Sequence, residues 1–340
     1  MNRAKELHSK HTVVDAHFDL PMEIYDRNQV GEKEIIKNNY LKTWQNAGIN
    51  LVVCAVFIED MYLPDMALKM ALLQIAGLIE DVSACEGNVV IIKSKKDLSE
   101  VISENKIGII ISLEGLEPIE DRLELLSIFY EIGVRGVGLT WSRRNHAADG
   151  STFGKDDEGH QGGLTKFGVK VLRKCKELGM LVDVSHLNDV GFEDVVKFSE
   201  NPFIASHSNV RNIANNKRNL TDEQIKAIAN KDGVIGIAAV KTINHMKLDE
   251  PDCVGILCDH IQYMINLVGA EHVGFGLDLC DEVYRYSLKY KESPYKINAI
   301  ENHEGLIAIT AELLKRKIKE EDIILVLGQN FINIWNKILK

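Results

Sequence analysis

The chain has 340 residues, 45% of them hydrophobic, and its formal net charge at pH 7 is −10. This composition is typical of a globular enzyme with a large core, and α/β barrels commonly exceed roughly 200 residues as one unit, so a single domain over residues 1–340 is expected. The acidic balance argues against a nucleic-acid partner, which requires clustered positive charge.

Short runs rich in Val and Ile alternate with longer amphipathic stretches. Eight of the runs are predicted to be strands, at residues 12–20, 49–58, 107–115, 134–141, 181–186, 202–208, 233–240 and 272–279. The amphipathic stretches predict helices, among them residues 66–85, 120–132, 166–179, 189–199 and 221–230. Several runs are apolar throughout, as in strands buried on both faces of a parallel sheet. Eightfold alternation predicts an α/β fold with a closed (β/α)8 barrel of TIM type, and an open doubly wound sheet is the alternative.

Local signals refine this outline. Thr221 and Gln224 have the spacing of a capping box, and Asn188 is placed to cap the helix at 189–199. Residues 283–302 fit no core strand, and we expect a loop with a helix there, as a candidate lid.

The N-terminus and the cysteines bear on location. The first ten residues are charged and lack the apolar core of a secretion signal, and the apolar runs are shorter than the roughly 20 residues that span a bilayer. The six cysteines include no C-x-x-C pair, which argues against a structural zinc knot and agrees with reduced thiols. A cytoplasmic protein without a membrane partner is therefore expected.

Metal-ligand residue types lie at the carboxyl ends of four of the predicted strands. These residues are His17, Asp19, Glu114, His186 and His207. His17 and Asp19 are two positions apart, so a strand turns both side chains to one face. The carboxyl ends of strands in a parallel barrel meet at one mouth, where this set would suit two divalent ions. A lone histidine there is more often a core residue, and Glu114 alone could cap a strand, but the repetition favours metal ligation.

Asp278 ends the last predicted strand. Close to cations it would stay ionised and could transfer a proton, which is the role we favour. The alternative is that it only orients a ligand histidine.

Short motifs along nearly the whole chain resemble one family in collinear order. They are Val14-Asp-Ala-His-Phe-Asp-Leu-Pro21, Ser112-Leu-Glu-Gly115, Gly138-Leu-Thr140, Asp183-Val-Ser-His186, Ser206-His-Ser208, Lys217-Arg-Asn-Leu-Thr-Asp222, Gly274-Phe-Gly-Leu-Asp278 and Gly328-Gln-Asn-Phe331. Together they resemble the membrane dipeptidase (renal dipeptidase, peptidase M19) family of the amidohydrolase-like superfamily.

The resemblance implies two zinc ions at the barrel mouth. One would be bound by His17, Asp19 and Glu114, and the other by Glu114, His186 and His207. Glu114 would therefore bridge the two ions. A hydroxide between the ions would attack the peptide bond of a dipeptide, including one with a D-residue at its carboxyl end.

The resemblance also assigns roles to two residues outside this ligand set. Asp278 would transfer the proton during peptide hydrolysis, and Arg218 would receive the substrate carboxylate. A solvated charge is the alternative for Arg218. Self-association as a homodimer is a further expectation from the family.

The chain departs from the family beside the substrate. Many relatives have a histidine that binds the substrate carbonyl where this chain has Trp141, and loss of one such donor can cost roughly two to three decades in rate. His146 is a candidate replacement, with Arg143 and Arg144 as others. Residues 279–282 also differ from the family pattern, which concerns the substrate pocket rather than the metals.

These departures leave two other functions open. The first is hydrolysis of another amide, a lactam or an ester by the same binuclear site. The second is a non-catalytic paralogue that keeps the fold, which the complete ligand set disfavours.

Overall fold

A computed structural model describes residues 1–151, 159, 161–247, 249–250, 252–286 and 296–340. Its strands are β1 (Val13–Phe18), β2 (Ile49–Phe57), β3 (Val89–Ile91), β4 (Ile107–Glu114), β5 (Val134–Gly138), β6 (Leu181–Asp183), β7 (Phe203–Ile204), β8 (Ile235–Ile237) and β9 (Val273–Phe275). All the ladders between these strands are parallel. Because parallel neighbours need a crossover, helices separate most of the strands along the chain.

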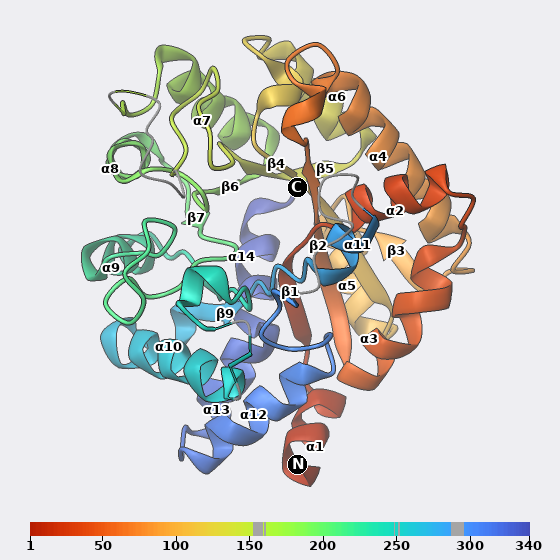
Figure 1. The fold of residues 1–340 in the computed structure, drawn as a ribbon, viewed down its shortest axis with the longest axis vertical. Coiled ribbons are helices and arrows are strands. Elements are labelled where there is room, and N and C mark those ends of the chain that lie inside the picture. Colours follow the sequence, from red (N-terminus) through yellow and green to blue (C-terminus); the bar gives the residue numbers. More distant parts are fainter. Residues whose placement is uncertain (152–158, 160, 248, 251, 287–295) are drawn as a thin grey trace.

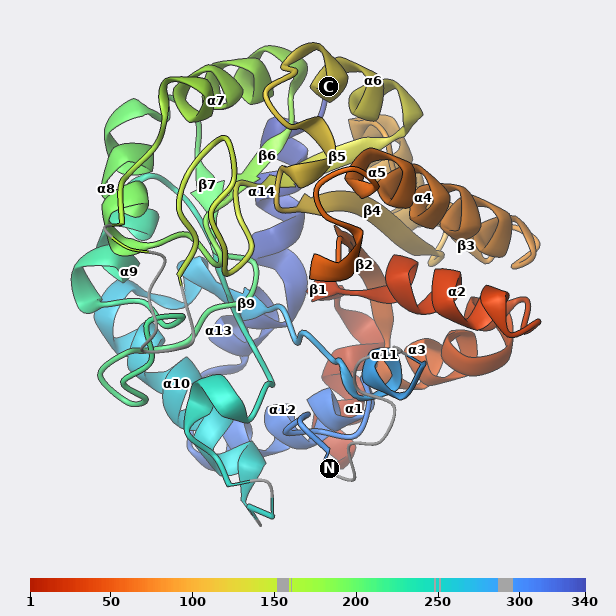
Figure 2. The same ribbon diagram turned by 45° about the horizontal axis from the view of Figure 1, so that its top comes forward.

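The helices surround the strands in both views (Figures 1 and 2). They are α1 (Asn2–Lys10), α2 (Leu20–Gln29), α3 (Leu41–Ala47), α4 (Ala67–Ser83), α5 (Lys95–Ser103), α6 (Glu124–Ile132), α7 (Lys166–Leu178), α8 (Asp189–Phe198), α9 (Asp222–Asn230), α10 (Cys253–Val268), α11 (Asp281–Tyr286), α12 (Gly305–Lys315), α13 (Glu320–Ile324) and α14 (Asn330–Ile338). None of the helices within the described residues is long and apolar enough to cross a membrane.

Hydrogen bonds join the strands into a closed ring. Six strands follow the order β1-β2-β4-β5-β6-β7, and β8 pairs with β9. Between β7 and β8, the carbonyl oxygen of Ala205, just after β7, accepts a hydrogen bond from Gly236 N at 2.8 Å. Between β9 and β1, Asp278 N, just beyond β9, donates to His17 O at 3.1 Å. The predicted α/β barrel is therefore confirmed.

The strands separate two apolar layers. Alternate residues of β1 and β2 belong to an outer cluster beneath the helices or to an inner cluster inside the ring. Val14 and Leu51 contribute to the inner cluster, whereas Val13 and Val52 contribute to the outer one. Side chains of α14, including Trp335, complete the inner cluster. The carboxyl ends of the strands are left for polar residues.

The sequence predicted most of these elements. Each of the eight expected strands is present, and the caps at Asn188 and Thr221 are confirmed, the latter as a full capping box. The short strand β3 was missed; it pairs with the first residues of β4, before the stretch of β4 that pairs with β5. The expected loop with a helix at 283–302 contains part of α11, but residues 287–295 lie outside the described residues.

Candidate metal centre

A bulge in β1 brings two predicted ligands to the mouth of the barrel. The pairing with β2 advances three residues on β1, from Asp15 to Phe18, but only two on β2. This extra residue lets His17 face the interior instead of the helices. Asp19 follows the strand as the N-cap of α2, and its Oδ1 lies 3.8 Å from His17 Nε2. The two side chains therefore share one face, as expected.

Glu114, the last residue of β4, lies at the centre of the cluster. Its Oε2 is 3.6 Å from His17 Nε2. Its Oε1 is 3.0 Å from His186 Nε2 and 3.6 Å from His207 Nε2. Each carboxylate oxygen thus faces a different side of the cluster, which is the geometry required of a bridging ligand.

The two other histidines come from consecutive strand ends. His186 lies three residues beyond β6 in the left-handed region, with φ of 66°, and His207 follows β7. Their ring centroids are 4.9 Å apart, and the rings of His17 and His207 are 3.7 Å apart. All five predicted ligands are therefore brought together, although His186 and His207 lie just beyond the observed strands.

Several ligand atoms are polar, buried and unsatisfied. Within the described residues, His17 Nε2, Asp19 Oδ1 and His207 Nε2 have no hydrogen-bond partner. Buried polar atoms are nearly always bonded, so three such atoms in one cluster indicate a missing partner of another kind. Imidazole nitrogens and carboxylate oxygens suit a divalent ion. Among the described residues, two overlapping groups meet the geometric requirements for an ion: His17, Glu114 and His207, and His17, Asp19 and Asp278.

The electrostatics also fit a cation. Burial raises the pKa of Glu114 well above its usual value, with Asp19 and Asp278 adding to the shift. Burial likewise raises the pKa of Asp19 to about 7. Burial, followed by nearby positive charge, lowers the pKa values of His186 and His207 well below the usual range. Neutral imidazoles are ready to bind metal, and a cation among the carboxylates would favour their ionised forms.

Asp278 and Arg218 lie beside the ligands. Asp278 follows β9 with φ of 55°, and its Oδ1 is 3.9 Å from His17 Nε2. Arg218 is only 4% exposed and donates from Nη2 to His207 O at 3.1 Å, while its Nε has no hydrogen-bond partner within the described residues. Burial lowers the pKa of Arg218 to about 10, opposed by Asp278 and Glu114. The guanidinium is therefore a buried, charged donor at neutral pH.

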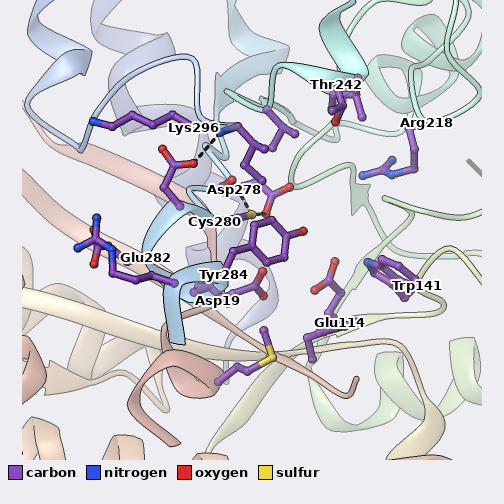
Figure 3. A pocket seen from close by; sticks show the side chains of 18 of the residues that line it. Asp19, Glu114, Trp141, Arg218, Thr242, Asp278, Cys280, Glu282, Tyr284 and Lys296 are labelled. Atoms are coloured by element: carbon purple, nitrogen blue, oxygen red, sulfur yellow. Dashed lines mark hydrogen bonds and ion pairs between the residues drawn. The ribbon is translucent and has the colours of Figure 1, made fainter. Parts of the chain in front are cut away.

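One cavity of about 740 Å³ is lined by Arg218, Asp278 and three of the predicted ligands, Asp19, Glu114 and His186 (Figure 3). Trp141 forms part of its wall, with its ring centroid 5.7 Å from that of His186 and 5.1 Å from that of Phe57. Arg143 stacks on Phe57 and Trp141 and donates to Glu117 at 2.7 Å, so it braces the wall from behind. Trp141 therefore lines the cavity, and its contact with a substrate stays a prediction.

His146 is not part of this cavity. Its side chain is exposed, and its carbonyl accepts from the Thr165 hydroxyl at 2.6 Å. The structure thus does not bring His146 to the cavity, because the loop after Trp141 turns away from the mouth of the barrel. Arg144 is also turned outward, and pairs with Asp149 at 2.5 Å.

The sequence missed residues that surround the ligands. Ser142 Oγ lies 2.7 Å from His186 Nδ1, and Ser206 Oγ lies 2.7 Å from His207 Nδ1. Asp183 contacts Ser206 in turn. Cys280 Sγ donates to Asp278 Oδ1 at 3.1 Å. A serine precedes both His186 and His207 in the sequence, but only the fold reveals that His186 Nδ1 is contacted by Ser142 instead.

A parallel α/β barrel whose mouth gathers buried imidazoles and carboxylates is the architecture of a metal-dependent hydrolase. The comparisons with known proteins agree. The chain belongs to the membrane dipeptidase family (peptidase family M19), whose sequence model matches residues 1–340. It is thus a metallopeptidase of the dipeptidase type, and the family implies a divalent metal.

Known proteins resemble the chain at moderate identity. Human dipeptidase 3 is 26% identical over 349 residues, which cover 99% of this chain and 67% of that protein. An uncharacterised protein of Acinetobacter calcoaceticus, from the PQQ-III 3′ region, is 31% identical over 188 residues, covering 53% of this chain and 58% of its own length. A metallo peptidase from Rhodobacter sphaeroides, solved with a phosphinate mimic of the dipeptide L-Ala-D-Ala, has a TM-score of 0.83 at 22% identity, with 96% of this chain and 99% of that chain covered.

Proposed function

We propose that this protein is a zinc-dependent dipeptidase that hydrolyses the peptide bond of dipeptides, including those with a D-residue at the carboxyl end. The observation that carries the proposal is the placement of one buried guanidinium, Arg218, beside five convergent ligands. The ligands supply a site for hydrolysis, and the guanidinium supplies a site for a carboxylate. The Rhodobacter sphaeroides relative with its dipeptide mimic supports the same class of substrate.

Zinc ions bound by His17, Asp19, Glu114, His186 and His207 would lower the pKa of a bound water and polarise the scissile carbonyl. Glu114 directs one oxygen toward His17 and the other toward His186 and His207, so it would hold both ions.

Arg218 and Asp278 act on the substrate itself. Arg218 binds the free carboxylate through N–H groups that include the unsatisfied Nε, because a guanidinium fork matches a carboxylate. A carboxylate fixed so close to the ligands leaves room for one residue after the scissile bond. The family and the dipeptide mimic of the Rhodobacter sphaeroides relative support a limit of one residue before it. Asp278, within 3.9 Å of a ligand histidine, carries the proton to the departing amine.

Metal analysis and a substrate panel test this proposal. Purified protein loaded with Zn²⁺ is expected to bind two equivalents and to hydrolyse L,L and L,D dipeptides, with far lower activity on tripeptides. Failure on the whole dipeptide panel by fully loaded protein would refute the dipeptidase assignment. Lactams and esters assayed side by side test the alternative, a related amidohydrolase with another substrate. The observation that supports this alternative is the aromatic cavity wall at Trp141. Protein without bound metal would instead indicate a non-catalytic paralogue.

A further inference from the structure

One ligand histidine is connected to a buried carboxylate through a serine hydroxyl. His207 Nδ1 lies 2.7 Å from Ser206 Oγ, and Ser206 Oγ also contacts Asp183 Oδ2. All three side chains are buried. Asp183 is the last residue of β6 and Ser206 follows β7, so the connection runs between adjacent strand ends.

Counting hydrogens fixes the direction of each bond. The Ser206 hydroxyl is the donor to Asp183 Oδ2, and this bond uses its single hydrogen. Ser206 Oγ can then only accept from His207 Nδ1, which must carry the ring proton. The Nε2 atom of a neutral His207 is therefore left with its lone pair, and this is the atom that faces Glu114 at 3.6 Å.

We propose that Asp183 and Ser206 are positioning residues that hold His207 in the Nδ1–H tautomer and so present Nε2 to the metal. The inference rests on the metal ligation proposed above, and it assigns roles to two residues that bind neither metal nor substrate. Hydrogen bonds to the second nitrogen of a ligand histidine generally fix its tautomer and ring orientation.

The two carboxylate oxygens of Asp183 accept different hydrogen bonds. Oδ1 accepts from the backbone N–H groups of Ser185 and Ser206, both at 2.9 Å, and these bonds tie the ends of β6 and β7 together. Oδ2 accepts only the Ser206 hydroxyl among the described residues. A substitution that changes Oδ2 alone can therefore separate control of the tautomer from support of the fold.

Asp183→Asn makes this separation. The amide oxygen can retain both backbone bonds at the Oδ1 position, while the amide NH₂ replaces Oδ2 and donates to Ser206 Oγ. The hydroxyl hydrogen is then free to point at His207 Nδ1, which moves the ring proton to Nε2 and blocks ligation. Ser206→Ala removes the connection without touching either backbone bond, and it carries the test if the Asn variant does not fold. Ser208→Ala is the matched control, because this buried hydroxyl belongs to the residue after His207 and has no hydrogen-bond partner among the described residues.

Two measurements on the full chain decide the matter. In metal-free protein, long-range ¹H–¹⁵N spectra of labelled histidines, assigned with His207→Gln, should show His207 protonated at Nδ1 in the wild type and at Nε2 in Asp183→Asn. In Zn²⁺ titrations against a chelator, Asp183→Asn and Ser206→Ala should weaken one of the two equivalents by about 10–100-fold and leave the other unchanged. Ser208→Ala should change neither measurement.

The outcomes separate this inference from the proposed function. A wild-type His207 protonated at Nε2, or variants with wild-type Zn²⁺ affinity for both equivalents, would overturn the role of Asp183 and Ser206. A wild-type protein that binds fewer than two equivalents would instead refute the binuclear site, while the tautomer spectra would still decide how His207 is held.

Discussion

Replacing Arg218 with methionine tests how the site recognises its substrate. The side chain is 4% exposed and donates one hydrogen bond, to His207 O, while Nε has no partner within the described residues. Methionine has a similar length and no charge, so it keeps the packing and removes the donors. We expect the variant to bind dipeptides poorly while retaining its metal.

The size of the effect follows from the bonds that are lost. A hydrogen bond to a charged group is worth about 1.5–3 kcal/mol, and about 1.4 kcal/mol corresponds to a factor of ten. Loss of the Arg218 contact should therefore lower kcat/KM for a dipeptide by about 10- to 150-fold. Arg218→Lys keeps the charge but not the planar fork, so its loss should be smaller.

Comparison with an uncharged substrate isolates this contact. Steady-state kinetics are measured on a dipeptide and on its C-terminal amide, for Arg218→Met and for the wild type. The wild type should prefer the free carboxylate by about the factor given above, and the variant should lose this preference. Arg122→Met is the control for loss of charge, because Arg122 is exposed and contacts only Asp121 among the ion pairs of the described residues. Equal losses on both substrates, with two metal equivalents still bound, would refute carboxylate recognition by Arg218.

Other changes separate the remaining roles. Glu114→Gln should lose both metal equivalents in elemental analysis, because one carboxylate faces all three histidines. Burial raises the pKa of Asp19 from 3.8 to about 7, so folded metal-free protein should lose stability as pH rises from about 4 to about 7; thermal unfolding of Asp19→Asn should lack this part of the slope. His146→Ala should change kcat/KM by less than about twofold, since the side chain is exposed outside the cavity. Cys280→Ala removes a donor to Asp278 and should lower kcat a few-fold at unchanged KM; a change in KM alone would contradict this role.

The fold and the clustering of the candidate metal ligands were predictable because both depend on local patterns. Uniformly apolar runs identified strands buried on both faces, and parallel strands bring their carboxyl ends together whatever the details of the loops. The strand β3 was missed because its three residues are too few to show any periodicity. The bulge that turns His17 inward was equally invisible, since an unpaired residue in β1 is defined only by its register against β2.

Residues whose role depends on a distant partner could not be assigned. Asp183 is separated by only two residues from His186, yet the structure connects it through Ser206 to a different histidine, His207. The reason is that adjacent parallel strands place 183 beside 204 and the residues that follow it, which is a tertiary relation. His146 illustrates the reverse error: proximity to Trp141 in sequence suggested a shared site, but an irregular loop has no periodicity that fixes where its side chains point.

The candidate metal ligands and part of the cavity wall belong to different parts of the fold: the ligands to the ring of strands, and the wall to the segment after Asp278. The candidate metal ligands lie at or just beyond the ends of strands whose hydrogen bonds run around the ring, so their positions are fixed by many bonds at once. The cavity residues Cys280 and Tyr284 instead belong to the segment after Asp278, where Tyr284 projects toward the space shared with Glu114 (Figure 3). The helix α11 in this segment packs on α2, where the Arg27 guanidinium stacks on Tyr286 at 4.8 Å. Because the hydrogen bonds that close the ring of strands do not involve α11, substitution of Tyr284 should change the ratio of kcat/KM values between dipeptides without changing the number of bound metal equivalents.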